Sequence, residues 1–244
     1  NVAIGYQAMN GGHTDADLDG CVAVGRLAMG GATLTAGADG TTAIGREALE
    51  ALTSGTGNVA VGWLSLTACS TSDYNTAVGT QALQAVTTGD GTNTAVGRAS
   101  GYALSTGSAN TYMGASSGFY NETGVNNTYL GYGAGTGVSG NNNSNNTAVG
   151  KDAMPAIQTG GGNTSVGAVT SSSISTGEHN TVVGYGAMSA GDNDDADDNT
   201  CIGYGAGDAI QEGNNNTLVG SLTDNQLRKN CSDAFQYMTE SGYK

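Results

Sequence analysis

Apolar and β-branched residues return in one fixed order along the chain. The block Asn-Thr-Ala-Val-Gly at 75–79 is repeated at 93–97, and closely similar blocks occur thirteen times before residue 221. Each copy ends in an anchor glycine: Gly5, Gly25, Gly45, Gly62, Gly79, Gly97, Gly114, Gly131, Gly150, Gly167, Gly184, Gly203 and Gly220. Their spacing is 17 to 20 residues, so the chain is a tandem repeat of a 17-residue unit with short insertions.

Each column of the repeat has its own character. The residue three before the anchor glycine is always Val or Thr, and the residue one before it is always apolar. Alternation with a period of two, together with β-branched side chains, predicts a short strand in every copy. We expect the residue one before the glycine, such as Val78, to be buried.

The length of the unit excludes a helical repeat. Seventeen residues cannot hold two helices and a turn, and Gly supplies 42 of the 244 residues. We therefore predict an all-β parallel solenoid, or β-roll, of about thirteen coils of 17–20 residues, each with two short strands. At about 4.8 Å between strands, the coils would form a rod on the order of 60 Å long. The rod is assigned to residues 1–220, and a non-repetitive cap or transition segment to residues 221–244.

Two further columns mark the corners of the coil. Asn opens eleven of the thirteen copies, as at Asn58 and Asn216, and we expect the stacked Asn side chains to form a ladder of hydrogen bonds along the rod. Ligand binding is the alternative for this column. In five copies a Ser-Gly or Thr-Gly pair places its glycine seven residues before the next anchor, where we expect a turn with positive φ. These glycines are Gly55, Gly107, Gly124, Gly160 and Gly177.

The column two before the anchor glycine is also mostly apolar, although in a strand it must point away from the Val column. A 17-residue coil encloses little interior, so we expect it to bury only one face of the strand. The small column is then predicted to pack against another chain in an obligate homo-oligomer. The predicted interface residues are Ala3, Ala23, Ala43, Ala60, Ala77, Ala95, Tyr112, Tyr129 and Ala148.

The block Asn-Thr-Ala-Val-Gly-Thr-Gln-Ala-Leu at 75–83, followed by Thr-Thr-Gly at 87–89, resembles repeats of two kinds of fibre. It is similar to the repeats of viral tail-fibre shafts and of the heads of trimeric autotransporter adhesins. The resemblance covers residue 1 to about 220 and implies a left-handed parallel β-roll in an intertwined or side-by-side homotrimer. It also implies an extracellular place, on a virion fibre or a cell surface.

Charge narrows the possible partners. The formal net charge is −14, with only seven Lys and Arg, which argues against binding to nucleic acid or to an anionic membrane. No run of 18 apolar residues is present, so no membrane insertion is expected. His13 and His179 lie in different coils without a catalytic motif around them, and the four cysteines show no metal-binding spacing. We do not expect an enzyme.

Acidic insertions are candidates for calcium. Asp-Ala-Asp-Leu-Asp-Gly at 15–20 matches the first half of a calcium-binding loop, but Arg26 occupies the place of the bidentate Glu. A second acidic loop spans residues 192–199. Calcium binding and a solvated acidic loop are alternatives for both, and no other cofactor is expected. The candidate ligands are Asp15, Asp17, Asp19, Asp192, Asp194 and Asp195.

The position directly after the anchor glycine is aromatic or basic in nine copies, and it holds four of the seven basic residues. Exposed aromatic rings and cations in a row can stack on sugars or on a protein surface, so this column is the candidate for binding a cell-surface glycan or a protein receptor. Mutual stacking along the rod is the alternative. The residues are Tyr6, Arg26, Arg46, Trp63, Arg98, Tyr132, Lys151, Tyr185 and Tyr204.

The predicted function is structural: a stiff extracellular rod in a fibre or adhesin that presents or contributes to surface attachment. One alternative is a subunit that polymerises end to end into a filament, because the sequence opens inside a repeat without a capping segment. A second alternative is an ice-binding solenoid, suggested by ten Thr in the column three before the glycine. We expect these Thr to share the buried side of the Val column, which would leave no exposed Thr array.

Overall fold

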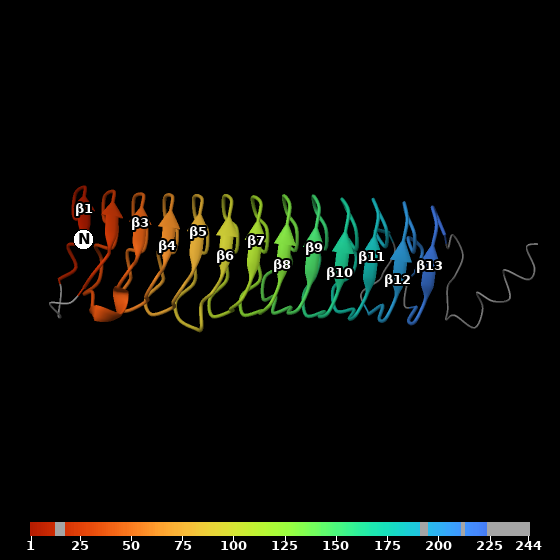
Figure 1. Ribbon diagram of the computed structural model, residues 1–244. Coiled ribbons are helices and arrows are strands. Elements are labelled where there is room, and N and C mark those ends of the chain that lie inside the picture. Colours follow the sequence, from red (N-terminus) through yellow and green to blue (C-terminus); the bar gives the residue numbers. More distant parts are fainter. Residues whose placement is uncertain (13–17, 191–194, 211–212, 224–244) are drawn as a thin grey trace, which may run out of the picture.

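The computed structural model describes residues 1–12, 18–190, 195–210 and 213–223. These residues form one rod of stacked coils, a parallel β-solenoid of about twelve turns (Figure 1). In the described part there is no α-helix, and a single 3₁₀ turn, η1 (Ala36–Ala38), lies beside the early coils. The all-β solenoid predicted from the repeat is confirmed. Residues 224–244, most of the predicted cap, lie outside the described residues.

Each coil contributes one three-residue strand to a single sheet. The strands pair in sequence order and in parallel, so that Thr76, Ala77 and Val78 lie opposite Thr94, Ala95 and Val96. The strands are β1 (Val2–Ile4), β2 (Val22–Val24), β3 (Thr42–Ile44), β4 (Val59–Val61), β5 (Thr76–Val78), β6 (Thr94–Val96), β7 (Thr111–Met113), β8 (Thr128–Leu130), β9 (Thr147–Val149), β10 (Thr164–Val166), β11 (Thr181–Val183), β12 (Thr200–Ile202) and β13 (Thr217–Val219).

The prediction of a second strand in each coil is wrong. The backbone after the anchor glycine turns through two left-handed residues, such as Gln81 (φ 60°) and Leu83 (φ 49°), and positive φ interrupts an extended strand. Hydrogen bonds between coils continue nevertheless, with Leu83 N donating to Ser100 O at 2.9 Å and Ala85 N to Tyr102 O at 3.2 Å. Turns therefore take the place of a second sheet.

The two faces of the strand are reversed relative to the prediction. The column two before the anchor lies inside its own chain: Ala23, Ala43, Ala60, Ala77, Ala95, Tyr112, Tyr129 and Ala148 are fully buried there. Ala3, in the first described coil, is exposed. The Val column points outward, and the side chains of Ile44 and Met113 are 40% and 43% exposed. A narrow coil accommodates the small side chain inside, so these eight buried residues do not lie on a surface that another chain could contact.

The interior is completed by the wall opposite the strand. Large apolar residues follow the anchor by four and by seven positions, as at Leu83 and Leu104, and both are fully buried. Where Tyr112 and Tyr129 replace Ala in the strand, glycine replaces Leu in the opposite wall. A Cβ on Gly118 would come within 2.7 Å of the Tyr112 ring, and one on Gly135 within 2.4 Å of the Tyr129 ring. Large and small side chains thus exchange places across the core.

Glycine is required at the anchor and at the corner for different reasons. The thirteen anchors all have φ between 131° and 141°, a region open only to glycine. A Cβ on Gly114 would also lie 2.2 Å from the carbonyl oxygen of Gly131. The five corner glycines do not have positive φ, contrary to the prediction. They are needed for space, since a Cβ on Gly107 would lie 2.3 Å from the Gly124 carbonyl oxygen.

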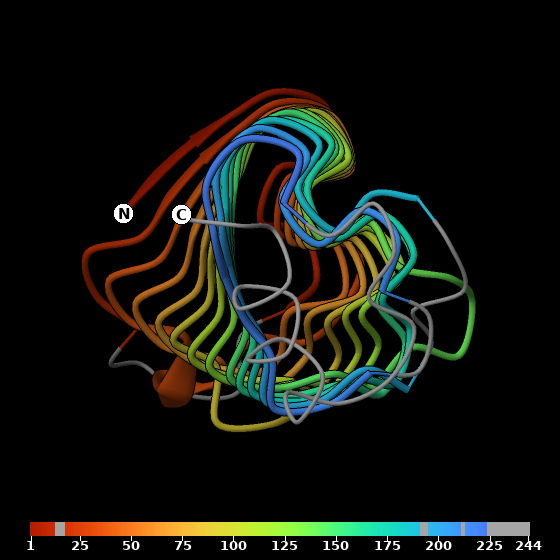
Figure 2. The same ribbon diagram turned by 90° about the vertical axis from the view of Figure 1, so that its right-hand side faces the viewer.

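The view along the rod shows coils of nearly constant outline that rotate slightly from one to the next (Figure 2). The green loop of coil eight projects from the stack. Among the residues that the structure describes, no helix is long and apolar enough to cross a membrane.

Candidate functional surfaces

The outward face of the sheet forms an uncharged strip along the whole rod. We call outer strip the residues three and one before each anchor glycine, such as Thr76 and Val78. In thirteen coils these positions hold only Thr, Val, Ile, Leu and Met. Val78, Val166 and Ile202 are exposed by 36% to 39%. Parallel sheets are normally covered on both faces, so this strip is an unusual surface for a single chain to present to water.

The column directly after the anchor glycine lies at one side of this strip, at the turn that follows the strand, and all nine predicted residues are exposed. We call it the ladder column. Every Lys and Arg of the described residues stands in it: Arg26, Arg46, Arg98 and Lys151. The sequence prediction of an exposed column thus agrees with the structure, and its binding role stays a prediction.

Neighbouring members of the ladder column also contact one another. The Arg46 guanidinium lies 5.9 Å from the centre of the Trp63 ring, and Arg26 and Arg46 both pair with Glu47, at 2.8 and 3.0 Å. Tyr185 and Tyr204 stack with their centres 5.8 Å apart and their planes 6° apart. The column is therefore both exposed and stacked along the axis.

Two ionisable groups beside the ladder column are perturbed by their partners. The hydrogen bond from Arg46, assisted by the charges of Arg46 and Arg26, lowers the pKa of Glu47. The hydrogen bond and charge of Asp152, with Nζ to Oδ2 at 2.8 Å, raise the pKa of Lys151. Lys151 is exposed, Glu47 is partly exposed and its Arg partners are exposed, so these pairs hold side-chain positions and add little stability.

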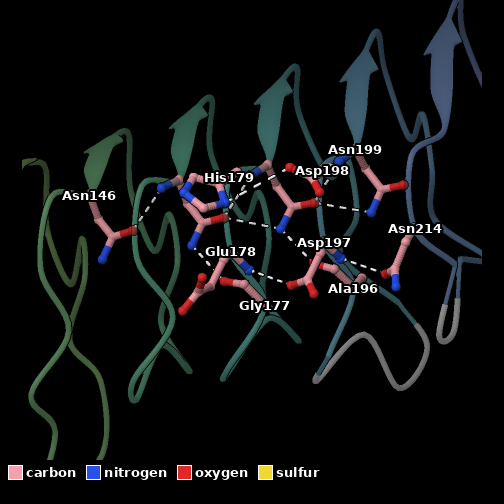
Figure 3. A network of polar contacts seen from close by, with 11 residues as sticks. Asn146, Gly177, Glu178, His179, Ala196, Asp197, Asp198, Asn199 and Asn214 are labelled. Carbon is pink, nitrogen blue, oxygen red and sulfur yellow. Dashed lines mark hydrogen bonds and ion pairs between the residues drawn. The ribbon is translucent and has the colours of Figure 1, made fainter.

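The predicted Asn ladder is confirmed, and it is a structural element. Asn58 Oδ1 accepts hydrogen bonds from the Asn75 backbone N–H at 2.8 Å and from Asn75 Nδ2 at 3.1 Å. Asn58 Nδ2 donates to the carbonyl of Ser72 at 2.8 Å, across the corner of the next coil. The same arrangement runs through Asn146 and Asn199 (Figure 3). These amides are buried and engaged on both sides, which favours the structural role over ligand binding.

A second ladder was not predicted from the sequence. A side chain two residues before the opening position of a copy, which is Asn in most copies, accepts a hydrogen bond from the backbone N–H of the same position in the preceding coil. Asp39 accepts from Asp19 at 2.8 Å, and Asp73 from Thr56 at 2.7 Å. In Figure 3, Asp197 accepts from Glu178 at 2.8 Å and Asn214 accepts from Asp197 at 2.7 Å. The recurrence of Asp at this single phase of the repeat was the available signal.

The calcium prediction is tested only in part. Asp15, Asp17, Asp192 and Asp194 lie outside the described residues. Asp19 and Asp195 are exposed, and the Asp195 carboxylate accepts a hydrogen bond from the Thr176 hydroxyl. No group of three or more His, Cys, Asp or Glu side chains with a metal-binding arrangement occurs among the described residues.

Histidine and cysteine side chains are dispersed over the rod. His179 is exposed, with Nδ1 3.8 Å from Asp198 Oδ1 (Figure 3). Cys21, Cys69 and Cys201 are buried in separate coils, and burial raises the pKa of Cys69 to about 12. A thiol with a raised pKa is a poor nucleophile, so Cys69 has the properties of a core residue. His13 and Cys231 lie outside the described residues.

Comparison with known proteins adds no family. No protein-family model, no curated protein and no solved structure shows significant similarity to the chain.

Proposed function

We propose that this chain is a stiff segment of an extracellular fibre or cell-surface adhesin, in which several copies associate laterally. The observation that carries the proposal is the outer strip, an uncharged sheet face that runs without interruption along thirteen coils. A single parallel sheet with one bare uncharged face is rare in an isolated chain. Association of copies through this face removes it from water, and a homotrimer is the form that the resemblance implies.

Stiffness is the second argument for a mechanical role. Each coil is bonded to the next by strand hydrogen bonds, by the turns of the opposite wall, and by the Asn ladder. A rod bonded on all sides bends little over its length of about 60 Å. The buried Asn side chains of neighbouring coils, such as Asn58 and Asn75, are engaged in these ladders, which fits a structural role better than a catalytic one.

The ladder column supplies a surface for attachment within this proposal. Its rings and cations are exposed and supported by neighbours, as in the Arg46–Trp63 pair. Such a surface suits a glycan or a protein receptor, because stacked and paired side chains lose little conformational freedom when a partner binds.

The test is the native mass of the wild-type chain by light scattering, compared with that of Val78→Glu. Val78 is 37% exposed, so the substitution should leave the coil folded while it places a charge in the outer strip. We expect a wild-type oligomer imaged as discrete rods, and a Val78→Glu variant of monomeric mass with unchanged circular dichroism. Thr71→Glu, at an exposed position outside the strip, is the matched control. A monomeric wild-type chain contradicts the proposal, and long filaments would support the end-to-end alternative.

One observation favours ice binding as a second candidate. The Thr column shares the outward face with the Val column, contrary to the prediction that both would be buried, and therefore forms a regular, partly exposed array. The rotation of successive coils works against a flat array (Figure 2). Thermal hysteresis measured at millimolar protein concentration tests this candidate. Equal freezing and melting temperatures, which mean no hysteresis, would eliminate it.

A further inference from the structure

The two sides of the outer strip differ in charge, although on the side after the strand Glu47 pairs with Arg26 and Arg46, and Asp152 pairs with Lys151. On the side after the strand, the ladder column holds every Lys and Arg of the described residues. On the side before the strand, within eight residues of the anchor glycine, lie eight of the described carboxylates, which we call the acidic corner. They are Asp19, Asp39, Asp73, Asp90, Glu178, Asp195, Asp197 and Asp198. The uncharged strip separates the two.

The opposite charges also occur in the same coils. The second coil carries Asp19 and Arg26, and the third carries Asp39 and Arg46. The sixth carries Asp90 four residues before β6 and Arg98 two residues after it, and neither makes an ion pair with any residue that the structure describes. Three of the four cations therefore have a carboxylate of the same coil on the opposite side of the strip.

In the eleventh and twelfth coils the ladder column carries tyrosine phenols in place of cations, again with carboxylates on the opposite side of the strip. Tyr185 and Tyr204 are 60% and 57% exposed in the eleventh and twelfth coils. The acidic corner of the same two coils holds Glu178, Asp197 and Asp198. A phenol hydroxyl donates a hydrogen bond to a carboxylate, so the two sides remain complementary where no cation is present.

The charge difference between the two sides of the strip distinguishes parallel from antiparallel association of two rods. Copies with parallel rods are related by rotation about an axis along the rods, and this rotation brings the cationic side of one strip to the acidic side of the next. Antiparallel rods are related by a two-fold axis across the rods, which brings like sides together. A closed ring involves no shift along its axis, so each coil meets the same coil of its neighbour.

We propose that copies of this chain associate with parallel rods in register, and that Arg98 of one copy pairs with Asp90 of the next. The inference rests on the proposed self-association and adds its direction and its contacts. The strip of three residues by thirteen strands covers on the order of 600 Å². With its two charged sides it approaches the roughly 800 Å² that each partner gives to a standard interface.

The first experiment mixes two charge-reversed chains. Arg98→Glu and Asp90→Arg alone each place like charges at the junction, and we expect each to weaken self-association roughly two- to fivefold per junction. An equimolar mixture should bind more tightly than either variant alone, because it joins the introduced glutamate of one chain to the introduced arginine of the other; in a homotrimer two of the three junctions become complementary. Recovery between different chains cannot arise from a pair inside one chain. Ala115→Glu, in the same column of the seventh coil, is the control that Asp90→Arg should not rescue.

The second experiment measures orientation directly. A spin label at Asn10→Cys, with Cys231→Ser, reports the distance between first coils of associated copies. Parallel rods should give about 20 to 40 Å, whereas antiparallel rods separate these coils by about 60 Å. An oligomer with the long distance, or a mixture no tighter than its parts, overturns this inference and leaves the proposed function intact. A monomeric wild-type chain overturns both.

Discussion

At the scale of single residues, the fold depends on backbone conformations that few residues adopt. Leu83 has φ 49° and is fully buried, so a left-handed conformation is accepted where it directs a large side chain into the core. Such a conformation costs about 1–2 kcal/mol, and burial of a Leu side chain offsets it with about 1.5–3 kcal/mol. At the anchor glycine no side chain offers this compensation, because the next coil fills the space.

We expect Gly114→Ala to destabilise the chain by about 3 kcal/mol or more. The substitution adds strain at φ 136° to a contact of 2.2 Å with the Gly131 carbonyl oxygen. The control is Gly40→Ala, where φ is 63° and nothing lies within 4 Å of the added Cβ, so only about 1 kcal/mol should be lost. Urea denaturation of both variants measures the difference. Equal losses would show that the close stacking of anchors does not limit this position.

The Cys69 thiol makes stability depend on alkaline pH. Burial raises the pKa of this thiol from 9.0 to about 12, so the folded state holds its proton more tightly. Its contribution is therefore complete below pH 9 and is lost as the pH rises toward 12, by about 1.4 kcal/mol at pH 10. Cys69→Ser should flatten the fall in unfolding free energy between pH 8 and 10.

Part of the alkaline decline should remain in that variant. Burial also raises the pKa of Cys21 and the pKa values of Tyr112 and Tyr129. The two tyrosines therefore contribute to the decline above pH 10. Identical pH profiles for the wild type and Cys69→Ser between pH 8 and 10 would contradict the assignment to Cys69.

At the scale of the coil, the core is a fixed volume shared between the strand and the opposite wall. Coil five fills it with Ala77 and Leu83, whereas coil seven fills it with Tyr112 and Gly118. The two solutions exchange a large and a small side chain across the same space. Each coil therefore tolerates a large residue on one wall only.

Tyr112→Ala should cost about 3–5 kcal/mol, because it leaves a cavity where the ring was. The double variant Tyr112→Ala, Gly118→Leu restores the pattern of coil five and should regain at least half of this loss. Leu is acceptable at Gly118 because φ is 61° there and 49° at Leu83. Gly118→Leu alone should destabilise the chain, since its Cβ would meet the Tyr112 ring. A double variant no more stable than Tyr112→Ala would show that the two walls do not share one space.

At the scale of the whole molecule, each coil contacts only its neighbours, so the rod behaves as a one-dimensional stack. Length is then set by the number of coils, and the outer strip keeps its composition whatever that number is. Association through the strip should grow in strength with the number of coils, because each adds the same area.

Removal of one whole unit should therefore leave a folded rod. Deleting residues 98–114 joins Gly97 to Ala115 and places Ala95, Gly118 and Tyr129 in the same order as Ala95, Gly101 and Tyr112 before the deletion. We expect native circular dichroism and a rod shorter by about 4.8 Å in small-angle scattering. Deleting residues 98–106 instead places turns beside strands and should unfold the neighbouring coils. Equal damage from the two deletions would argue against a modular stack.

The sequence by itself determined the period, the number of coils, the register of the strands and the Asn ladder. These follow from the order of side chains in each repeat, because identical coils in contact must place equal positions side by side. Only the tertiary structure decided which face of the strand is inside. Both faces are apolar, and a period of two has two equivalent phases; the narrow coil resolves them by enclosing the small column.

The structure also decided the role of the turns and of the second ladder. The wall opposite the strand bonds to its neighbours through left-handed turns, as at Gln81 and Leu83. The sequence of this wall carries no pattern that distinguishes such turns from a second strand. Asp39 and Asp73 appear in the sequence as solvated acids, yet each accepts a backbone N–H from the coil before it. Such roles depend on which backbone groups the stacked coils leave without a partner, and that is a property of the assembled rod.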